Sequence, residues 1–485
     1  MNQILVAFLF LSSLFTQAEE TPPPPAPAAK GPNILLIFAD DLAWDALAFN
    51  GNPVVKTPHL DRLAKQGSNF SHCYNMGSWC PAVCVASRTM LNTGRFVWRA
   101  GALNLPQEAA QGRTWAQSLE KAGYVTYMTG KWHVDGLSPK ACFQKFGKVR
   151  PGMPQTTKDV YKRPKATGQE TWTPWDESLK GYWEGGKHWS VVTADDAIAY
   201  LDSRRGKTQP FFAYVAFNAP HDPSQAPKSF VDMYPAAKVD LPRNFLPLAP
   251  FYDKIGCGKD LRDEALCTFP RSPEAIRQHR GEYYALISHF DQQVGRILDQ
   301  LEASGQDKNT LVIFTADHGL ACGHHGLMGK QNMYEHSLRT AFILRGPGIP
   351  AGRQVTTPIY LQDAFPTSLE AAGIAVPSFV EFKSVLPLLG TQPPPHYASI
   401  YGCYSSDLQR CVIDQGWKLI HYPKLGTSML FDLAQDPDEM HDLASDPLQT
   451  SRLAELRQKL VELENELEDP LQVKSAKPLR EPKSE

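Results

Sequence analysis

The chain has 485 residues, of which 42% are hydrophobic and 21% are charged, and its formal net charge is −2. This length allows one large globular domain with a smaller second one, and the composition is ordinary for a folded protein. Because the charge is close to neutral, the sequence gives no basis for a nucleic-acid partner or for a track that binds a long polyanion. We predict neither.

The N-terminal segment predicts export. Residues 1–15 are mostly apolar and lack acidic side chains, and Thr16-Gln17-Ala18 then offers small side chains of the kind that a signal peptidase accepts. An uncleaved membrane anchor is the alternative, but this run is short for a span and no second run approaches that length. We therefore predict a signal peptide at 1–18, a secreted or periplasmic protein and no stable membrane insertion.

Proline marks the next boundary along the chain. The proline-rich segment at 19–31 cannot pack as a helix or strand and is predicted to be an extended linker. We predict a catalytic domain at 32–399 and a C-terminal subdomain at 400–470. A polar tail at 471–485 follows.

Short apolar runs alternate with helical patterns, which is typical of parallel strands buried on both faces of an α/β sheet. Proline and glycine bound two expected helices, one from Pro58 to Gly67 and a longer one from Pro273 to Gly305. The clearest expected strands are Ile34–Phe38, Tyr124–Met128, Phe211–Phe217, Leu311–Phe314 and Ala341–Leu344.

Beyond residue 400 the pattern changes to shorter elements. Strand-like runs at Trp417–Tyr422 and Met429–Leu433 precede a polar helix at 451–467. The predicted fold is therefore α/β, with a large, mixed, mostly parallel sheet sandwiched by helices. A smaller C-terminal antiparallel sheet with one helix completes it.

Polar residues directly follow four of the expected strands. A single polar residue there is more often a helix cap or loop anchor than a functional group. Because the carboxyl ends of parallel strands meet at one edge of a sheet, where ligands bind, four cases together predict a functional site. They are Asp40 with Asp41, Lys131 with His133, Asn218 with His221, and Asp317 with His318.

Four of these residues suit a metal ion. Asp40, Asp41, Asp317 and His318 offer carboxylate oxygens and one imidazole, which fit a hard divalent cation, calcium before magnesium. Two adjacent carboxylates at the end of a buried strand repel each other unless a cation neutralises them. Tetrahedral zinc fits less well, because no thiolate or second histidine is obviously available. We predict one calcium ion.

Cys84-Val85-Ala86-Ser87-Arg88 precedes a run that ends in Thr93-Gly94-Arg95. This segment resembles the Cys-x-Pro-x-Arg signature of type I sulfatases, which belong to the alkaline phosphatase-like superfamily. An Asp-Asp pair, Gly-Lys-x-His, a later Pro-His, Asp-His-Gly and a downstream lysine, here Lys330, also occur in the family's order. The resemblance extends from about residue 32 to residue 443.

The resemblance implies that the formylglycine-generating enzyme oxidises Cys84 to formylglycine and that the protein hydrolyses sulfate esters with this nucleophile and calcium. Ala86 stands where the family usually has proline, and this proline is part of the motif in which the cysteine is converted. Without its surroundings, Cys84 would be interpreted as a buried or disulfide-bonded thiol.

The same resemblance implies roles for five more side chains. Arg88, Lys131 and Lys330 would place positive charge around the sulfate. His133 would be the base that triggers sulfate release, and His221, with Lys330, would protonate the leaving oxygen.

The predicted substrate is a sulfated saccharide that enters from its end. The export signal, the near-neutral charge and the family resemblance favour it. A phosphonate monoester or phosphodiester hydrolase of the same superfamily and a non-catalytic glycan-binding homologue remain alternatives. Candidate contacts to the sugar, each with simple surface hydrogen bonding as its alternative, are Asp222, His324, His325, His336 and Arg339.

Nine cysteines in an exported chain predict disulfide bonds, and setting Cys84 aside leaves eight. Cys403 with Cys411 and Cys257 with Cys267 flank short segments, so each pair is a candidate local disulfide. Other pairings remain open.

Overall fold

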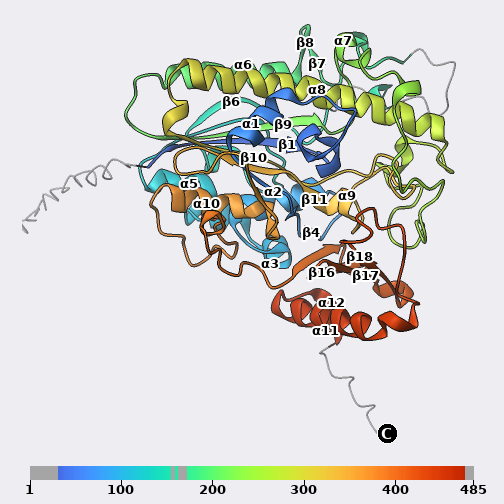
Figure 1. Ribbon diagram of the computed structural model, residues 1–485. Helices are drawn as coiled ribbons and strands as arrows, with labels where there is room; N and C mark the ends of the chain where they lie inside the picture. The colour runs from blue at the N-terminus through green and yellow to red at the C-terminus, as the bar shows by residue number, and fades with distance from the viewer. Residues whose placement is uncertain (1–30, 155–158, 162–171, 476–485) are drawn as a thin grey trace, which may run out of the picture.

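The computed structural model describes residues 31–154, 159–161 and 172–475 (Figure 1). The predicted signal peptide, nearly all of the linker at 19–31 and most of the tail at 471–485 lie outside these residues. None of the described helices is both long and apolar enough to cross a membrane.

An eight-stranded sheet forms the centre of the molecule, in the order β13-β2-β12-β10-β1-β9-β5-β6. Strands β10, β1, β9, β5 and β6 are mutually parallel, and β12 is antiparallel to β10. The sheet is therefore mixed and mostly parallel, as predicted. Its strands are β1 (Asn33–Asp40), β2 (Ser68–Phe70), β5 (Val125–Lys131), β6 (Lys145–Arg150), β9 (Phe211–Pro220), β10 (Thr310–Ala316), β12 (Phe342–Arg345) and β13 (Arg353–Val355).

The apolar runs explain the central strands. From Ile34 to Asp40 every residue of β1 is buried, because helices cover both faces of the sheet. Alternate residues of β1 enter two different cores: Leu35 and Ile37 pack on one side, and Leu36 on the other. All five expected strands are present. The strand predicted at 341–344 is antiparallel to its neighbour β10, whereas the other four are parallel to one another.

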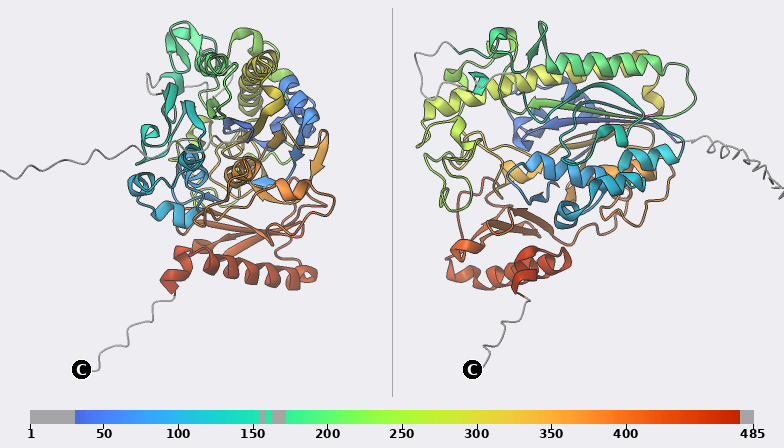
Figure 2. Two further views of the ribbon diagram at one scale, coloured as in Figure 1. Left: turned by 90° about the vertical axis from the view of Figure 1, so that its left-hand side faces the viewer. Right: turned by 180° about the vertical axis from the view of Figure 1, so that it is seen from behind.

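Three helices cover one face of the sheet and three cover the other (Figures 1 and 2). The Ser272 side chain caps the longest helix, α8, by accepting a hydrogen bond from Ala275 N, and Pro273 occupies its first turn. The first face carries α1 (Pro58–Gln66), α6 (Trp189–Ser203) and α8 (Pro273–Ala303), and the second carries α2 (Val83–Thr93), α5 (Trp115–Lys121) and α10 (Ala364–Ala371).

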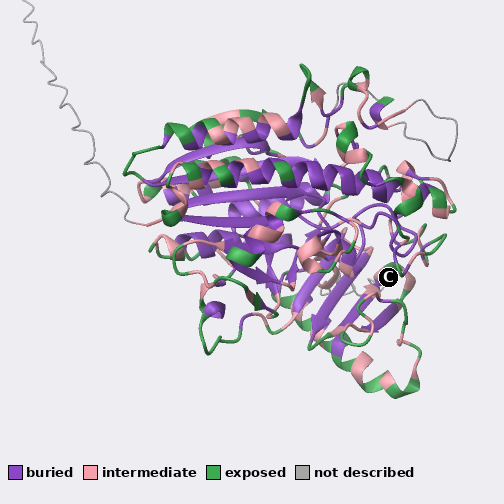
Figure 3. Cartoon of the chain, turned by 45° about the horizontal axis from the view of Figure 1, so that its top comes forward, coloured by how far each residue is buried: buried purple, intermediate pink, exposed green. Residues whose placement is uncertain are grey.

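Shorter elements join these layers. Figure 3 shows the central strands buried beneath helices whose outer surfaces are exposed. The remaining short helices are α3 (Val97–Ala102), α4 (Leu105–Ala110), α7 (Lys228–Val231) and α9 (Glu335–Leu338), and the short strands are β3 (Cys73–Tyr74), β7 (Trp183–Glu184), β8 (Lys187–His188), β11 (Arg339–Thr340) and β14 (Ile359–Tyr360).

The C-terminal sheet also has the predicted form, antiparallel and covered by a helix (Figure 1). It gains one strand that the sequence did not predict, because β4 (Gly77–Ser78) pairs in parallel with β15. At Gly77 a Cβ atom would lie 1.8 Å from Cys403 O, so only glycine allows this approach. The other elements are β15 (Ile400–Tyr404), β16 (Gln409–Asp414), β17 (Trp417–Tyr422), β18 (Thr427–Asp432), α11 (Thr450–Glu466) and α12 (Pro470–Ser475).

Neither predicted disulfide is present. All nine cysteines lie in the described residues, and none of them is disulfide-bonded. In the β15–β16 hairpin, Cys411 lies opposite Gly402 and not opposite Cys403, so the two cysteine side chains point to opposite faces of the sheet. Cys257 donates its thiol hydrogen to Gln331 O at 3.2 Å and belongs to a different hydrophobic cluster from Cys267.

Candidate active site

The carboxyl ends of β10, β1, β9 and β5 meet at one edge of the sheet, and the predicted polar residues meet there too. Lys131 at the end of β5 forms a buried ion pair with Asp40 at the end of β1. The backbone N–H of Asp41 donates to Asp317 Oδ1 at 3.1 Å. His221 Nε2, just after β9, lies 3.8 Å from Asp41 Oδ2.

Asp41 has an unusual backbone conformation. Its φ of 61° lies in the left-handed region, which costs free energy for a residue other than glycine. Tyr283 of α8 holds the turn, because its hydroxyl donates to Asp41 O at 2.6 Å and accepts from Ala43 N at 3.0 Å. The long helix thus fixes the direction of the Asp41 carboxylate.

The donor atoms at this edge fit a hard divalent cation. His318 Nε2 lies 3.2 Å from Asp41 Oδ1 and 3.5 Å from Asp317 Oδ1. One oxygen of Asp40 is buried and has no hydrogen-bond partner among the described residues, although Arg88 Nη2 lies 3.6 Å away. Three buried carboxylates, one imidazole and an oxygen of Asp40 without a hydrogen bond are a donor set that calcium or magnesium prefers.

The electrostatics of these groups favour the same ion. Burial raises the pKa of Asp41 well above its usual value, with Lys330 and then His318 opposing that shift. Burial lowers the pKa of His318, but the nearby Asp317 and Asp41 carboxylates outweigh it and raise the value to about 10. A bound cation would displace this proton and stabilise the ionised carboxylates.

Cys84 lies directly beside this cluster. Its Sγ is 3.2 Å from His318 Nε2 and 3.8 Å from Asp41 Oδ1. Helix α2 begins at Val83, so position 84 is inside the first turn of the helix. A nucleophile formed at this position would therefore face the metal-binding residues and the positive end of the helix dipole.

Arg88 lies one turn further along α2 and is fully buried. Its Nε donates to Asp317 Oδ2 at 3.1 Å, and its Nη1 donates to Lys131 O at 3.1 Å. The guanidinium carbon also lies 4.6 Å from the centre of the Phe38 ring. Arg88 therefore connects α2 rigidly to the ends of β5 and β10.

Lys330 adds a second buried ammonium group. Its Nζ lies 2.7 Å from Asp41 Oδ2 and 3.7 Å from Asp263 Oδ2. Burial alone would lower the lysine pKa, but Asp263 and then Asp41 raise it well above its usual value. Lys330 therefore stays protonated beside position 41.

His133 has the opposite electrostatics. Burial, followed by the charge of Lys131, lowers the pKa of His133 to about 4, so its imidazole is neutral near pH 7. Its φ of 51° is also left-handed. A Cβ at Gly152 would lie 2.4 Å from the His133 ring, so the ring depends on a glycine at 152.

His221 pairs with a residue that the sequence had suggested as a sugar contact. Its Nδ1 lies 3.2 Å from Asp222 Oδ1, and Arg262 holds the same carboxylate with two donors at 2.6 and 2.9 Å. Arg262 also pairs with Asp263 at 2.5 Å. Burial, followed by Lys330, lowers the pKa of His221 well below its usual value, and the nearby Asp40 carboxylate opposes that shift.

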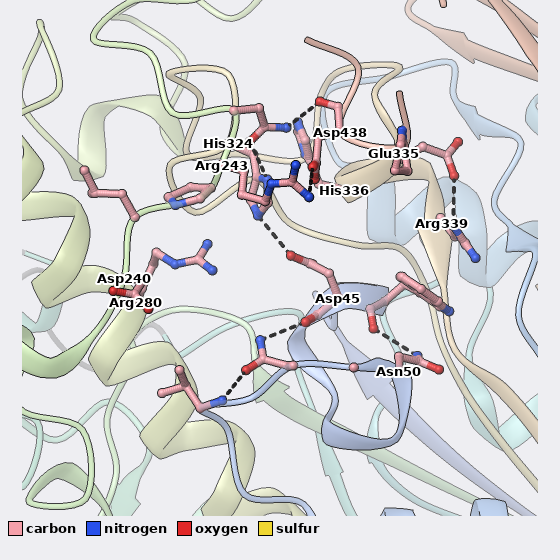
Figure 4. Close-up of a pocket in the computed structure, with 18 of the residues that line it drawn as sticks. Asp45, Asn50, Asp240, Arg243, Arg280, His324, Glu335, His336, Arg339 and Asp438 are labelled. Carbon is pink, nitrogen blue, oxygen red and sulfur yellow. Dashed lines mark hydrogen bonds and ion pairs between the residues drawn. The ribbon is translucent and has the colours of Figure 1, made fainter. Parts of the chain in front are cut away.

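The structure does not bring the five candidate sugar contacts together. Asp222 lies beside His221, whereas His324, His336 and Arg339 line a separate cavity of about 570 Å³ (Figure 4). His325 stacks on Tyr334 with ring centroids 4.0 Å apart. None of the ten residues predicted for catalysis or metal binding lines this cavity.

Four residues of the site were missed from the sequence. Arg262 and Asp263 lie in a loop between β9 and α8 that has no periodic pattern, so no signal marked them. Gly152 and Tyr283 act through close packing and a hydrogen bond to the backbone. Gly152 lies 19 residues from His133 in the sequence, and Tyr283 lies 242 residues from Asp41. Both interactions therefore depend on tertiary contacts.

Comparisons with known proteins agree with this geometry. The family model described as Sulfatase matches residues 32–374, and a model described as N-sulphoglucosamine sulphohydrolase, C-terminal, matches residues 323–466. An arylsulfatase of Clostridium perfringens is 29% identical over 85% of this chain and 90% of its own. An ulvan-active sulfatase of Formosa agariphila is 30% identical over 86% and 78%, respectively.

A solved structure of a protein in complex with its substrate D-glucosamine-2-N,6-O-disulfate superimposes with a TM-score of 0.72. It is 24% identical and covers 91% of this chain and 99% of its own, which supports the fold. The phosphonate monoester hydrolase of Silicibacter pomeroyi has a TM-score of 0.71 at 22% identity, with 90% of this chain and 96% of its own covered.

The mostly parallel sheet, with Cys84 beside a carboxylate cluster at its carboxyl edge, and the sulfatase relatives together make the chain a member of the alkaline phosphatase-like superfamily. Within that superfamily the chain belongs to the sulfatase family, whose model matches 32–374. It is a sulfuric ester hydrolase.

Proposed function

We propose that this sulfatase removes sulfate from a sulfated saccharide with a formylglycine formed from Cys84 and one calcium ion. The observation that carries the proposal is the contact of Cys84 Sγ with His318 and Asp41, which places position 84 against the carboxylate cluster. Asp40, Asp41, Asp317 and His318 would hold the ion.

When bound, calcium would polarise the sulfate ester, and formylglycine, as its hydrate, would supply one hydroxyl to attack sulfur and a second to release sulfate. Lys131 pairs with Asp40 and Lys330 pairs with Asp41, so each carboxylate of this pair has a buried ammonium group beside it. The two ammonium groups neutralise charge that develops on the sulfate oxygens. Arg88 keeps α2 aligned with the strand ends through its hydrogen bonds to Asp317 and Lys131.

Two histidines move protons in this proposal. His133 is neutral near pH 7 and accepts the proton that must leave before sulfate departs. His221 donates a proton to the leaving oxygen of the sugar, with Lys330 nearby; the sulfate anion bound beside it would raise the pKa that burial and Lys330 hold low in the free site. The backbone oxygen and the carboxylate of Asp222 hold Nδ1 of His221, so the opposite nitrogen, Nε2, faces Asp41.

Relatives support a saccharide as the substrate. The N-acetylglucosamine-6-O-sulfatase of Bacteroides thetaiotaomicron is 25% identical over 90% of this chain and 86% of its own. The ulvan-active sulfatase also acts on a glycan, as its name states. An exported location, inferred from residues 1–18, and maturation by the formylglycine-generating enzyme belong to the same proposal.

A substrate panel tests the proposed function. Purified protein is assayed with sulfated monosaccharides, short oligosaccharides, long polymers, choline sulfate, aryl sulfates and phosphodiesters, with Cys84→Ala as the inactive reference. We expect the highest kcat/KM on a saccharide sulfated at its end. Faster turnover of choline or aryl sulfates than of every saccharide would refute the carbohydrate assignment, and faster turnover of phosphodiesters would refute the proposed reaction.

A further inference from the structure

The cavity in Figure 4 is separate from the active site but shares a wall with it. Tyr284 lines the cavity, and its neighbour Tyr283 holds Asp41 O. On the other side, Ser337 follows the lining residue His336, and its backbone oxygen accepts a hydrogen bond from Gly319 N at 2.8 Å. Gly319 in turn follows the predicted metal ligand His318. The volume of about 570 Å³ is within the range of about 300–1,000 Å³ typical of small-molecule sites.

The charges around the cavity do not favour an anion. Each arginine of the lining already has a polar partner: Arg243 pairs with Asp438 at 3.1 Å, Arg339 with Glu335 at 3.5 Å, and Arg280 donates to the Tyr284 hydroxyl at 2.6 Å. Burial, followed by His324, lowers the pKa of His336 and keeps it neutral. The lining carboxylates outnumber the three arginines and are Asp45, Asp240, Glu335, Asp438 and Glu439.

The lining instead combines apolar surfaces with many hydrogen-bonding groups. Trp44, Val54, Leu241, Pro242 and Tyr284 provide flat or apolar contacts in a lining that also holds the five carboxylates. A sugar ring has the matching chemistry, because its C–H face packs on aromatic and aliphatic groups while its hydroxyls bond to carboxylates and amides.

Some side chains of the lining have unmet hydrogen-bonding capacity. Trp44 Nε1, Arg280 Nε and His336 Nε2 are buried nitrogen atoms with no hydrogen-bond partner among the described residues. All three belong to side chains that line the cavity. Buried polar atoms are nearly always satisfied by protein, water or a ligand, so these three indicate a polar occupant.

We propose that this cavity is a second binding site, which takes a neutral saccharide unit and performs no chemistry on it. Sulfated or otherwise anionic sugars bind here more weakly, because five carboxylates line the cavity and two of its three arginines are already paired with carboxylates. The inference does not depend on the proposed substrate of the active site, since it concerns unsulfated sugars.

Binding of unsulfated sugars to the purified full-length protein tests the proposal. Saturation-transfer NMR and calorimetry would compare neutral galactose, N-acetylglucosamine and lactose with cationic glucosamine and anionic glucuronate. We expect saturable binding of at least one neutral sugar with a Kd of about 1 mM, and weaker binding of glucuronate. Absence of saturable binding by every neutral sugar, or tighter binding of glucosamine or glucuronate than of all neutral sugars, would overturn the proposal.

A cavity-filling variant locates the site. Val54→Trp should weaken neutral-sugar binding about tenfold or more, while turnover of a small aryl sulfate stays unchanged. Val376→Trp makes the same change at an exposed valine outside the cavity and should bind like the native protein. Asp240→Ala, at an exposed lining position, repeats the test if the bulky variant unfolds. If folded Val54→Trp binds the sugar as the native protein does, the sugar binds elsewhere and the assignment is wrong. If Val54→Trp unfolds, native sugar binding by Asp240→Ala refutes the assignment in the same way.

Discussion

The backbone oxygen of Asp222 lies 2.7 Å and its carboxylate Oδ1 lies 3.2 Å from His221 Nδ1, so Asp222 orients the histidine whose Nε2 faces Asp41. Arg262 holds the same carboxylate with two hydrogen bonds. Asp222 is therefore better described as a positioning residue for His221 than as the sugar contact suggested by the sequence.

Asp222→Asn should slow turnover according to the leaving group. For a sulfated sugar, whose alkoxide needs a proton, we expect kcat to fall about 10- to 100-fold, because a misplaced His221 donates that proton poorly. For 4-nitrophenyl sulfate, whose phenolate leaves without help, the loss should be within about threefold. Asp232→Asn, at an exposed acid paired with Lys228, is the matched control and should behave like the native protein. Equal losses on both substrates would contradict the positioning role.

Tyr283→Phe tests whether α8 fixes the turn at Asp41, which belongs to the proposed calcium site. Removing the hydroxyl removes its hydrogen bonds to Asp41 O and Ala43 N, so the strained Asp41 backbone loses its support. We expect calcium affinity, measured by calorimetry on metal-free protein, to fall about 10- to 100-fold.

The matched control for Tyr283→Phe is Tyr200→Phe. The Tyr200 hydroxyl is buried without a hydrogen-bond partner among the described residues, so its loss should leave calcium binding unchanged. A native calcium affinity in Tyr283→Phe would show that the turn is stable without this helix contact.

Gly152→Ala should impair catalysis without disturbing the rest of the fold. The new Cβ would come within 2.4 Å of the His133 ring, which must then move. A displacement of this size is expected to lower kcat about 100-fold with little change in KM. Gly258→Ala is the control, because its Cβ would have no neighbour closer than 3.8 Å. Native kcat in Gly152→Ala would exclude His133 from the rate-limiting chemistry.

Asp291 on α8 predicts a pH-dependent contribution to stability. It accepts hydrogen bonds from His59 N at 3.2 Å and Leu60 N at 2.8 Å, and burial raises its pKa from 3.8 to about 7. Because the folded state holds this proton more tightly, native stability declines as pH rises from about 4 to about 7. Asp291→Asn removes that decline, so the variant should gain stability relative to the native protein across this range.

Urea unfolding at several pH values from about 4 to about 8 measures the difference for Asp291→Asn. Asp299→Asn, an exposed change on the same helix, should follow the native pH dependence. Parallel stability curves for Asp291→Asn and the native protein would contradict the raised pKa.

Much of the central fold could be predicted because its signals are local. The buried run of β1 has no polar interruption from Ile34 to Ala39, and Ser272 with Pro273 marks the start of α8 by capping chemistry. The convergence of Asp40 and Lys131 followed from the parallel direction of β1 and β5, since their carboxyl ends share one edge.

The remaining features depend on contacts between distant segments. Strand β4 has only two residues, too few for a periodic signal, and forms because Gly77 admits the backbone of Cys403. The disulfide prediction for Cys403 and Cys411 failed because spacing does not specify the hairpin register. The grouping of His324 with Asp222 failed because the chain turns away after His318 and pairs Ala321 with Gly329 instead.

The most direct test of the proposed nucleophile is a mass spectrum of the peptide that contains Cys84, from protein produced in its own host and shown to be active. We expect a peptide in which the thiol sulfur has been replaced by an aldehyde oxygen, in proportion to the specific activity of the preparation. A fully active preparation that carries only an unmodified thiol at position 84 would contradict it.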